Sequence, residues 1–446
     1  MRSLALAVAV SVLAVSAHTL PDPRFDGTGG KTPQGPTPVD APLKANAGQP
    51  VDHRSWVTVA AGDAASRTAA ASAGLSIEEV RPGEVSGFAT DAALARLKAK
   101  GLSVRSSQPL MSRFGALDFP RQDADFHNYS EAVAALQAVA ASAPDLVSLF
   151  SIGKSFEGRD LWALRLNTDA KGTAPSKKPG IVFMGAHHAR EHLSVEVPLR
   201  IAQRLVAQRA EPAIARLLKE RDVYFIPLVN PDGAEYDVSG DKYHMHRKNM
   251  RPNGDGSTGT DLNRNYAFRW GGQGASGDPR DDTYHGPSAF SEPETQAVKA
   301  FVEARPNLTV LLSYHTFSEL VLYPWGGTDE SISDATALAA FKNMATEMAG
   351  MTGYRAMQSS DLYVATGDTC DWAWAERGIF AFTFELTPKS MWDGGFYPGA
   401  AAIAKTTQAN WRPALYLIDL ADDPRRAARA GVAAVFSGNA ERSLTR

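Results

Sequence analysis

The stretch GIVFMGAHHAREHLSVEVPLR at residues 180–200 decides the fold class. It opens as an apolar strand and becomes polar at GAHHAREH. It then continues as a helix, which we expect to begin at Ser194 as N-cap, with Pro198 in its first turn. A strand that is apolar throughout is buried on both faces, as in a sheet covered by helices. The polar residues follow its carboxyl end, where open α/β sheets bind their ligands.

Strands and helices alternate on both sides of this stretch, over residues 120–423. Examples of the apolar strands are RDVYFIPLVN, LTVLLSYHT and FAFTFEL. This alternation predicts an α/β domain built on a mixed, mostly parallel sheet flanked by helices.

A smaller unit precedes this domain at residues 51–108, with the order strand, helix, strand, strand, helix, strand. Its second helix is expected to have Asp91 as N-cap and to stop at Gly101. The βαββαβ order predicts a ferredoxin-like α+β domain. We interpret it as an inhibitory pro-domain, with an accessory module as the alternative. Residues 109–119 then form an exposed activation connector that a protease can cut.

The two ends of the chain carry different signals. Residues 1–17 have a basic start, a short apolar run and small residues at the end, which predicts a cleaved signal peptide. The run is too short for a membrane-spanning helix, which needs roughly 20 apolar residues. Residues 18–50 are rich in Pro, Gly and polar residues and read as a disordered linker. Residues 424–446 form a basic tail without an assigned role.

Charge and cysteine content limit the partners and the compartment. The 46 basic and 49 acidic residues leave a formal charge of −3, so we expect neither a nucleic acid nor a membrane as partner. Cys370 is the one cysteine, which excludes an intramolecular disulfide. These features suit a bacterial secreted protein, extracellular or periplasmic, that is held together by its core.

Two strand ends supply candidate metal ligands. His188 and Glu191 follow the strand of residues 180–184, and His315 follows the strand LTVLLSY. Two imidazoles and one carboxylate are a set that zinc accepts while keeping a position open for water. The sequence therefore predicts one Zn²⁺ in the α/β domain, bound by His188, Glu191 and His315.

The letters HAREH also satisfy the inverted zinc motif H-x-x-E-H. In that reading His188 and His192 bind the metal and Glu191 is the general base. It requires the three residues to share one helical face, whereas the strand ends directly before them.

Seven motifs occur in the order seen in zinc metallocarboxypeptidases of the funnelin type, and the chain resembles this family over nearly all of residues 120–420. They are HAREH at 188–192, NPDG at 230–233, HRKN at 246–249, DLNRN at 261–265, SYHTFSE at 313–319, DLY at 361–363 and FAFTFE at 380–385. The resemblance implies a monomeric zymogen, activated by a protease, that hydrolyses the C-terminal bond of peptides and proteins.

The resemblance also assigns roles to matching residues. Glu385 is implied to be the general base that takes a proton from metal-activated water and passes it to the leaving amine. Arg247 is implied to stabilise the oxyanion that forms at the attacked carbonyl.

The substrate-binding residues come from the same resemblance. Arg264 and Asn263 are implied to hold the terminal carboxylate, which a guanidinium can bind through two oxygens. Tyr363 is implied to close over the substrate, Arg190 to contact it, and Asp261 to fix the tautomer of a histidine ligand.

Side-chain specificity is implied to depend on Asp368 and Cys370. A small, weakly polar Cys370 favours apolar terminal residues, whereas an off-centre carboxylate at Asp368 could pair with Lys or Arg, so the pocket should accept both kinds. The alternative is that Asp368 only caps a helix. There are three departures from the better-known digestive members, at His192, His244 and Phe317. Those at His244 and Phe317 put the outer subsites in doubt but not the chemistry, and the one at His192 does not count against activity.

Two rival functions remain open. A peptidase for cell-wall peptides would share the chemistry and differ in its pocket. A non-catalytic peptide-binding protein would normally lack a metal ligand or the general base, and this chain has both.

Overall fold

The computed structural model describes residues 54–110, 123–240 and 243–429. The predicted signal peptide, linker and nearly all of the connector lie outside these residues, as does the tail beyond residue 429. Among the described helices, none combines the length and apolar character that crossing a membrane requires.

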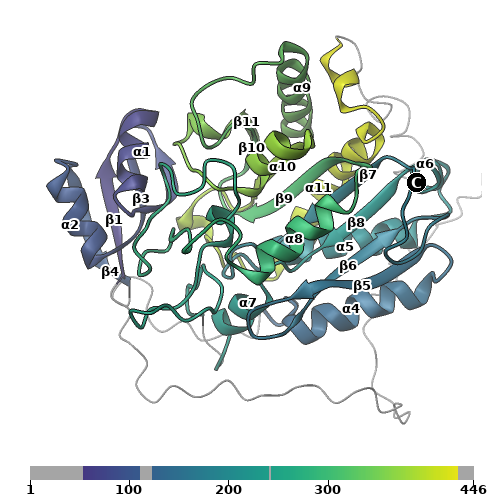
Figure 1. Ribbon diagram of the computed structural model, residues 1–446, viewed down its shortest axis with the longest axis horizontal. Helices are drawn as coiled ribbons and strands as arrows, with labels where there is room; N and C mark the ends of the chain where they lie inside the picture. Colours follow the sequence, from purple (N-terminus) through teal and green to yellow (C-terminus); the bar gives the residue numbers. More distant parts are fainter. Residues whose placement is uncertain (1–53, 111–122, 241–242, 430–446) are drawn as a thin grey trace, which may run out of the picture. The chain divides into compact units, whose positions relative to one another are not determined.

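The N-terminal domain is the small α+β unit that the sequence predicts (Figure 1, purple and blue). Its elements are β1 (Arg54–Ala60), α1 (Ala64–Ser72), β2 (Ser76–Arg81), β3 (Glu84–Thr90), α2 (Asp91–Ala99) and β4 (Val104–Pro109). The sheet order is β2-β3-β1-β4 with antiparallel neighbours. Together with the two helices, this is the ferredoxin-like arrangement.

The boundaries of α2 differ by one residue from the prediction. Thr90, not Asp91, is the N-cap, because its side chain accepts the backbone N–H of Ala93. Asp91 is the first helical residue, where its negative charge favours the positive end of the helix dipole. Gly101 follows the helix with φ of 73°, a left-handed conformation that glycine adopts without strain.

The second domain is built on an eight-stranded sheet of order β11-β10-β12-β9-β7-β8-β6-β5. The strands are β5 (Val147–Lys154), β6 (Asp160–Leu166), β7 (Gly180–Met184), β8 (Asp222–Ile226), β9 (Leu308–Thr316), β10 (Leu320–Tyr323), β11 (Arg355–Gln358) and β12 (Phe380–Leu386). The central strands β12, β9, β7 and β8 are parallel, and antiparallel pairs lie towards both edges. The prediction of a mixed sheet is confirmed.

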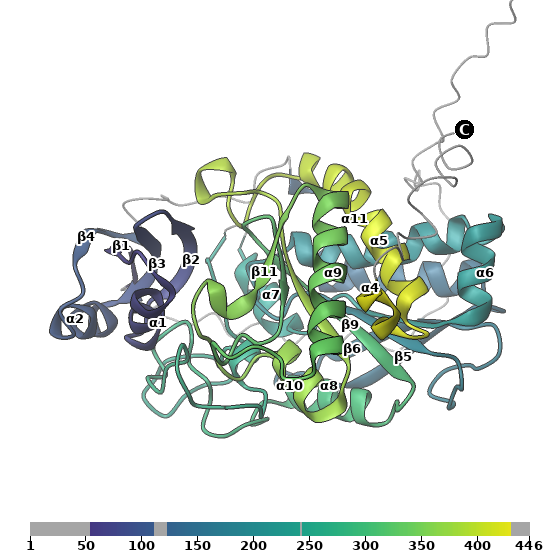
Figure 2. The same ribbon diagram turned by 90° about the horizontal axis from the view of Figure 1, so that it is seen from above.

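Helices cover both faces of this sheet (Figures 1 and 2). The helices are α4 (Tyr129–Ser142), α5 (Leu193–Ala207), α6 (Pro212–Glu220), α7 (Pro231–Asp237), α8 (Pro293–Glu303), α9 (Ala335–Thr352), α10 (Thr369–Arg377) and α11 (Ala401–Leu420). One core joins α4, α5, α6, α9 and α11 to the sheet, and a second core joins α8 and α10 to the opposite face. The fully buried strands β7 and β8 are therefore mostly apolar, and the one charged residue among them, Asp222, is paired with the buried Arg165 at 2.7 Å.

The turn after β7 depends on a close backbone approach. A Cβ at Gly185 would lie 1.9 Å from the carbonyl oxygen of Ser194, so only glycine fits. Ser194 is not the N-cap that the sequence predicts, since α5 begins at Leu193. Its hydroxyl instead accepts from the N–H of Ala186 and donates to the carbonyl of Glu191, which ties the two ends of the loop together.

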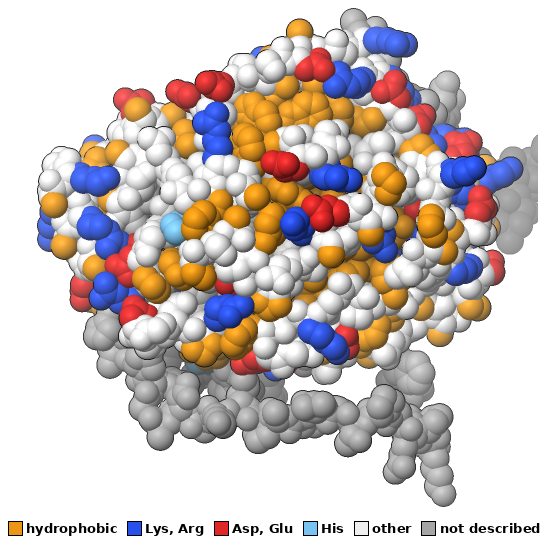
Figure 3. Space-filling model, in the orientation of Figure 1, with side chains coloured by type: hydrophobic (Ala, Val, Ile, Leu, Met, Phe, Trp, Pro, Cys, Tyr) orange, Lys and Arg blue, Asp and Glu red, His pale blue; other side chains and the backbone are white. Residues whose placement is uncertain are grey.

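The first residues of the predicted tail belong to the body of this domain. They form the short 3₁₀ helix η5 (Pro424–Ala428), in which Arg426 pairs with Asp419 at 2.8 Å. On the face drawn in Figure 3, acidic and basic side chains are interspersed over the surface.

Candidate active site

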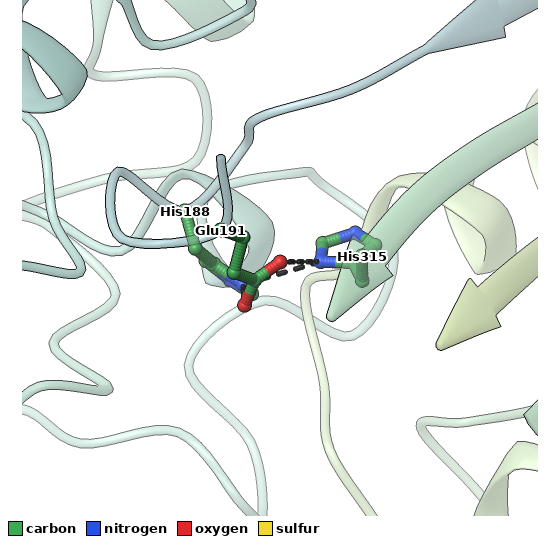
Figure 4. Close-up of side chains that lie close together, drawn as sticks. All are labelled: His188, Glu191 and His315. Atoms are coloured by element: carbon green, nitrogen blue, oxygen red, sulfur yellow. Dashed lines mark hydrogen bonds and ion pairs between the residues drawn. The ribbon is translucent and has the colours of Figure 1, made fainter. Parts of the chain in front are cut away.

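Three side chains converge beyond the carboxyl ends of β7 and β9 (Figure 4). Nδ1 of His188 lies 2.7 Å from Glu191 Oε1, and Nδ1 of His315 lies 3.0 Å from Glu191 Oε2. The two Nδ1 atoms are 3.2 Å apart. All three residues are almost fully buried, with exposures of 4%, 2% and 1% for His188, Glu191 and His315.

The second ring nitrogen of each imidazole, Nε2, has a hydrogen-bond partner on the side away from the cluster. Nε2 of His188 lies 3.2 Å from Asp261 Oδ1, and Nε2 of His315 lies 3.0 Å from the hydroxyl of Ser313. Burial opposes ionisation of Asp261, but Arg247 and His188 keep the pKa of its carboxyl well below the usual value. An anionic Asp261 accepts the Nε2 proton of His188 and leaves the Nδ1 lone pair facing the cluster.

This donor set fits zinc. Two imidazole nitrogens that turn their lone pairs towards each other and towards a carboxylate need a cation between them. Burial raises the pKa of Glu191, but His188 and His315 outweigh it and lower the pKa below its usual value, so the carboxylate is anionic. Among the described residues, this is the group of three that could hold a metal ion.

His192 does not belong to this group. Its Nε2 lies 2.9 Å from Asp237 Oδ2, a carboxylate that also accepts the hydroxyl of Tyr397. The geometry therefore supports the ligand set with His315 over the inverted motif.

A cavity of about 600 Å³ opens from the three ligands, and Glu385 and Arg247 line it. Glu385 lies beside His315 because β12 and β9 pair in parallel with these two residues in register. Burial and the charge of Glu191 raise the pKa of Glu385 well above its usual value. Arg247 donates from Nε to Asp261 at 2.9 Å, which orients its guanidinium.

The residues expected to bind the substrate carboxylate line the same cavity. Asn263 and Arg264 lie on the 3₁₀ helix η2 (Leu262–Arg264), and Arg264 is oriented by bonds from Nη1 to its neighbour's carbonyl and from Nε to Gly274. Tyr363 also lines the cavity, and burial raises the pKa of its hydroxyl.

The two carboxylate oxygens of Asp368, which also lines this cavity, have different surroundings. Oδ1 accepts the N–H groups of Cys370 and Asp371 and so caps α10. Oδ2 is buried, and no donor among the described residues reaches it. The helix cap foreseen as an alternative thus uses one oxygen only.

Cys370 lies behind the cavity wall. Its Sγ is 3.2 Å from Oγ1 of Thr383, and it is Thr383 that lines the cavity. Burial raises the thiol pKa of Cys370 well above its usual value. Sequence reasoning missed Thr383, although its position two residues before Glu385 on one strand places both side chains on the same face.

Arg190 contacts the N-terminal domain. It is fully buried and donates to Asp282 at 2.9 Å and to Glu78 of β2 at 2.7 Å. Its guanidinium also lies over the rings of Phe88 and Phe396, at 4.8 and 4.5 Å from their centroids.

His244 and Phe317, which differ from the digestive members of the family, both pack against other aromatic rings. The ring of His244 stacks on Tyr236, and Phe317 contacts Phe396 edge to face. Phe317 also lines the cavity.

The chain is similar to known proteins of one family. Residues 132–413 match the family model described as zinc carboxypeptidase. The chain belongs to the zinc carboxypeptidase family. A zinc carboxypeptidase from Saccharothrix mutabilis subsp. capreolus is 37% identical over 66% of this chain and 69% of its own length.

A second relative and a solved structure are also similar to this metallocarboxypeptidase. Carboxypeptidase A4 of Mus musculus is 32% identical, and the match covers 62% of this chain and 65% of the mouse protein, just under two thirds of its length. The crystal structure of carboxypeptidase A from Helicoverpa armigera has the same fold, with a TM-score of 0.68 at 24% identity over 85% of this chain and 99% of that one.

Proposed function

We propose that this metallocarboxypeptidase is a secreted bacterial exopeptidase, made as a latent precursor, that removes both hydrophobic and basic residues from peptide C-termini. The observation that carries the proposal is the convergence of the metal ligands, Glu385, Arg264 and the unpaired oxygen of Asp368 on one cavity.

The roles of the side chains follow from their positions. Zinc held by His188, Glu191 and His315, when bound, would polarise the scissile carbonyl and lower the pKa of water. Arg264 binds the terminal carboxylate through its guanidinium. Arg247 donates to the oxygen on which negative charge develops.

Glu385 moves the proton. Its raised pKa means that it holds a proton readily, so the carboxylate can take one from water and return it to the leaving amine. Asn263 and Tyr363, which line the same cavity, complete the enclosure of the substrate's end.

The dual specificity rests on Asp368. A buried carboxylate oxygen without a donor favours a cationic partner, such as the side chain of Lys or Arg. Burial also raises the pKa of Asp368, so the carboxyl can become neutral when an apolar side chain occupies the cavity. Gly326 leaves room here, since a Cβ would lie 3.3 Å from Oδ2.

Asp368→Asn is expected to reduce kcat/KM for C-terminal Arg or Lys by roughly 10-fold, because a partly buried charge pair contributes on the order of 1–3 kcal/mol. Phe and Leu substrates should change little, since the amide oxygen can still cap α10. The measurement compares kcat/KM for peptides that differ only in the last residue. Equal losses on both classes would make Asp368 structural, and a parent enzyme inactive on basic ends would refute the dual specificity.

The latency rests on contacts between the N-terminal domain and the site. Residues 77–82 of β2 and its turn line the cavity together with the metal ligands. Glu78 pairs with Arg190, as described above, and helix α1 holds the loop that carries Tyr363. In that loop, Val364 N–H donates to the Thr68 hydroxyl at 2.8 Å, and Arg67 donates to the carbonyls of Asp361 and Leu362.

Cleavage of the connector at residues 109–119 is expected to raise kcat/KM by at least about 10-fold, because the substrate must replace a buried ion pair to enter. Limited proteolysis with intact-mass analysis and a peptide assay measures this. In the uncut chain, Glu78→Gln should restore part of the activity. The matched control is Glu79→Gln, whose carboxylate pairs with Arg81 inside the same domain. Full activity in the uncut parent would reduce the domain to an accessory module.

The general test is a mixed peptide pool. After incubation with the cleaved, zinc-loaded protein, mass spectrometry should find products shortened by single C-terminal residues. Selective loss from cell-wall peptides containing D-residues or diamino acids would favour the cell-wall rival, and intact peptides would favour a non-catalytic binding protein.

A further inference from the structure

His187 precedes the first metal ligand and lies outside all the roles assigned so far. Its side chain is fully buried, and its ring stacks on that of His315 with centroids 5.7 Å apart. Its Nδ1 lies 3.2 Å from the hydroxyl of Ser313. Its Nε2 lies 3.1 Å from the hydroxyl of Thr369 and 3.0 Å from that of Tyr266.

The partners of His187 are themselves hydrogen-bonded to two residues of the candidate site, His315 and Asn263. Ser313 reaches Nε2 of His315 at 3.0 Å. On the other side, Thr369 donates to Oδ1 of Asn263 from its hydroxyl at 2.9 Å and from its backbone N–H at 3.0 Å. An unbroken chain of hydrogen bonds therefore joins a metal ligand to a residue of the carboxylate-binding group.

The proton positions along this chain follow from the chemistry of its two ends. His315 faces the other metal ligands with Nδ1, so its Nε2 carries the proton and donates to Ser313. The hydroxyl of Ser313 then donates to Nδ1 of His187. A neutral imidazole with Nδ1 as acceptor has Nε2 as donor, here to Thr369. The Thr369 hydroxyl accepts this hydrogen bond, and its own proton is donated to Oδ1 of Asn263.

The result at Asn263 is a fixed amide orientation. Its Oδ1 is engaged by two donors of Thr369, so its NH₂ group is the part left to face the cavity that it lines. An NH₂ group is the donor that a substrate carboxylate requires, whereas a flipped amide would present an oxygen to it.

We propose that His187 is a positioning residue that sets, through one hydrogen-bond chain, both the tautomer of the ligand His315 and the amide orientation of Asn263. This inference rests on the proposed function for its substrate half only. The metal half concerns the zinc affinity of the protein and requires no peptide.

Four substitutions test the two halves of this inference. Ser313→Ala should weaken zinc binding by roughly 10-fold, as loss of a ligand's supporting partner does, and leave KM nearly unchanged. Thr369→Val should raise KM by about 5-fold, the worth of one hydrogen bond, and leave zinc affinity unchanged. His187→Phe should produce both effects. His187→Gln keeps a donor near the position of Nε2 but no acceptor near Nδ1, so it should weaken zinc binding while sparing KM.

Zinc dissociation constants are measured by chelator competition on the full chain, and KM and kcat with one peptide after connector cleavage. Tyr314→Phe is the control, because it removes a buried hydroxyl without a described partner from the neighbouring position of β9. Unchanged zinc affinity and KM in His187→Phe would overturn the inference, and so would equal changes in Tyr314→Phe. If His187→Phe does not fold, the opposite pattern in His187→Gln, a raised KM with full zinc affinity, overturns it. A parent protein that shortens no peptide would refute the proposed function, while the zinc measurements would still test His187.

Discussion

Glu385→Gln is expected to lower kcat by roughly 10²-fold or more while zinc content and stability stay near those of the parent. The amide has the shape of the carboxylate but cannot accept the proton from water. Glu385 on β12 lies in register with His315 on β9. Because Gln has the same length as Glu, the substitution should remove the proton carrier without moving the strand. Steady-state assays on metal-replete protein measure kcat, and elemental analysis measures the zinc content.

The matched control for this variant is Glu319→Gln. Glu319 also lines the cavity, but its carboxylate accepts the hydroxyl of Thr387 at 2.7 Å. This control should retain most of the turnover. A near-normal kcat in the Glu385 variant would remove Glu385 from the mechanism.

Substitution of any one of the three predicted metal ligands is expected to have the second large effect. His188→Ala, Glu191→Ala or His315→Ala should each weaken zinc binding by more than roughly 100-fold, since loss of a supporting partner alone costs about 10- to 100-fold. Activity at limiting zinc should fall in parallel. Chelator competition gives the affinities, and elemental analysis gives the occupancy.

His192→Ala is the control that separates the two readings of HAREH. Its ring is bonded to Asp237, so zinc affinity should stay within a few-fold of the parent. Loss of zinc in His192→Ala, with retention in His315→Ala, would establish the inverted motif instead.

Local pattern was sufficient for the fold class and for the three residues that converge as candidate metal ligands. The apolar strand 180–184 and the largely apolar strand 308–314 predicted a covered parallel sheet. Because parallel strands end at the same edge, His188, Glu191 and His315 were expected to meet there, and the structure brings them together. The βαββαβ order likewise predicted the topology of the N-terminal domain. The N-cap of α2 differed by one residue and that of α5 by two, because neighbouring residues compete for the first turn of a helix.

The family's motifs extended the prediction to Glu385, Arg247, Asn263 and Arg264, which line one cavity in the structure. They could not say which oxygen of Asp368 faces the cavity, or that Thr383 stands in front of Cys370. Both features depend on the packing of α10 against β12. This packing leaves no pattern in the sequence around Asp368, Cys370 or Thr383.

The sequence by itself thus determined the order of elements, the sheet edge that carries the candidate site and the three residues that meet there, because each depends on residues close in the chain or on strand direction. Only the tertiary structure decided the pairing of Glu78 with Arg190 and the chain from His315 through His187 to Asn263. These contacts join segments that are distant in sequence, and a hydrogen bond between such segments leaves no periodicity in either one. It forms only where the packed sheet and helices bring a donor and an acceptor within about 3 Å in the buried interior.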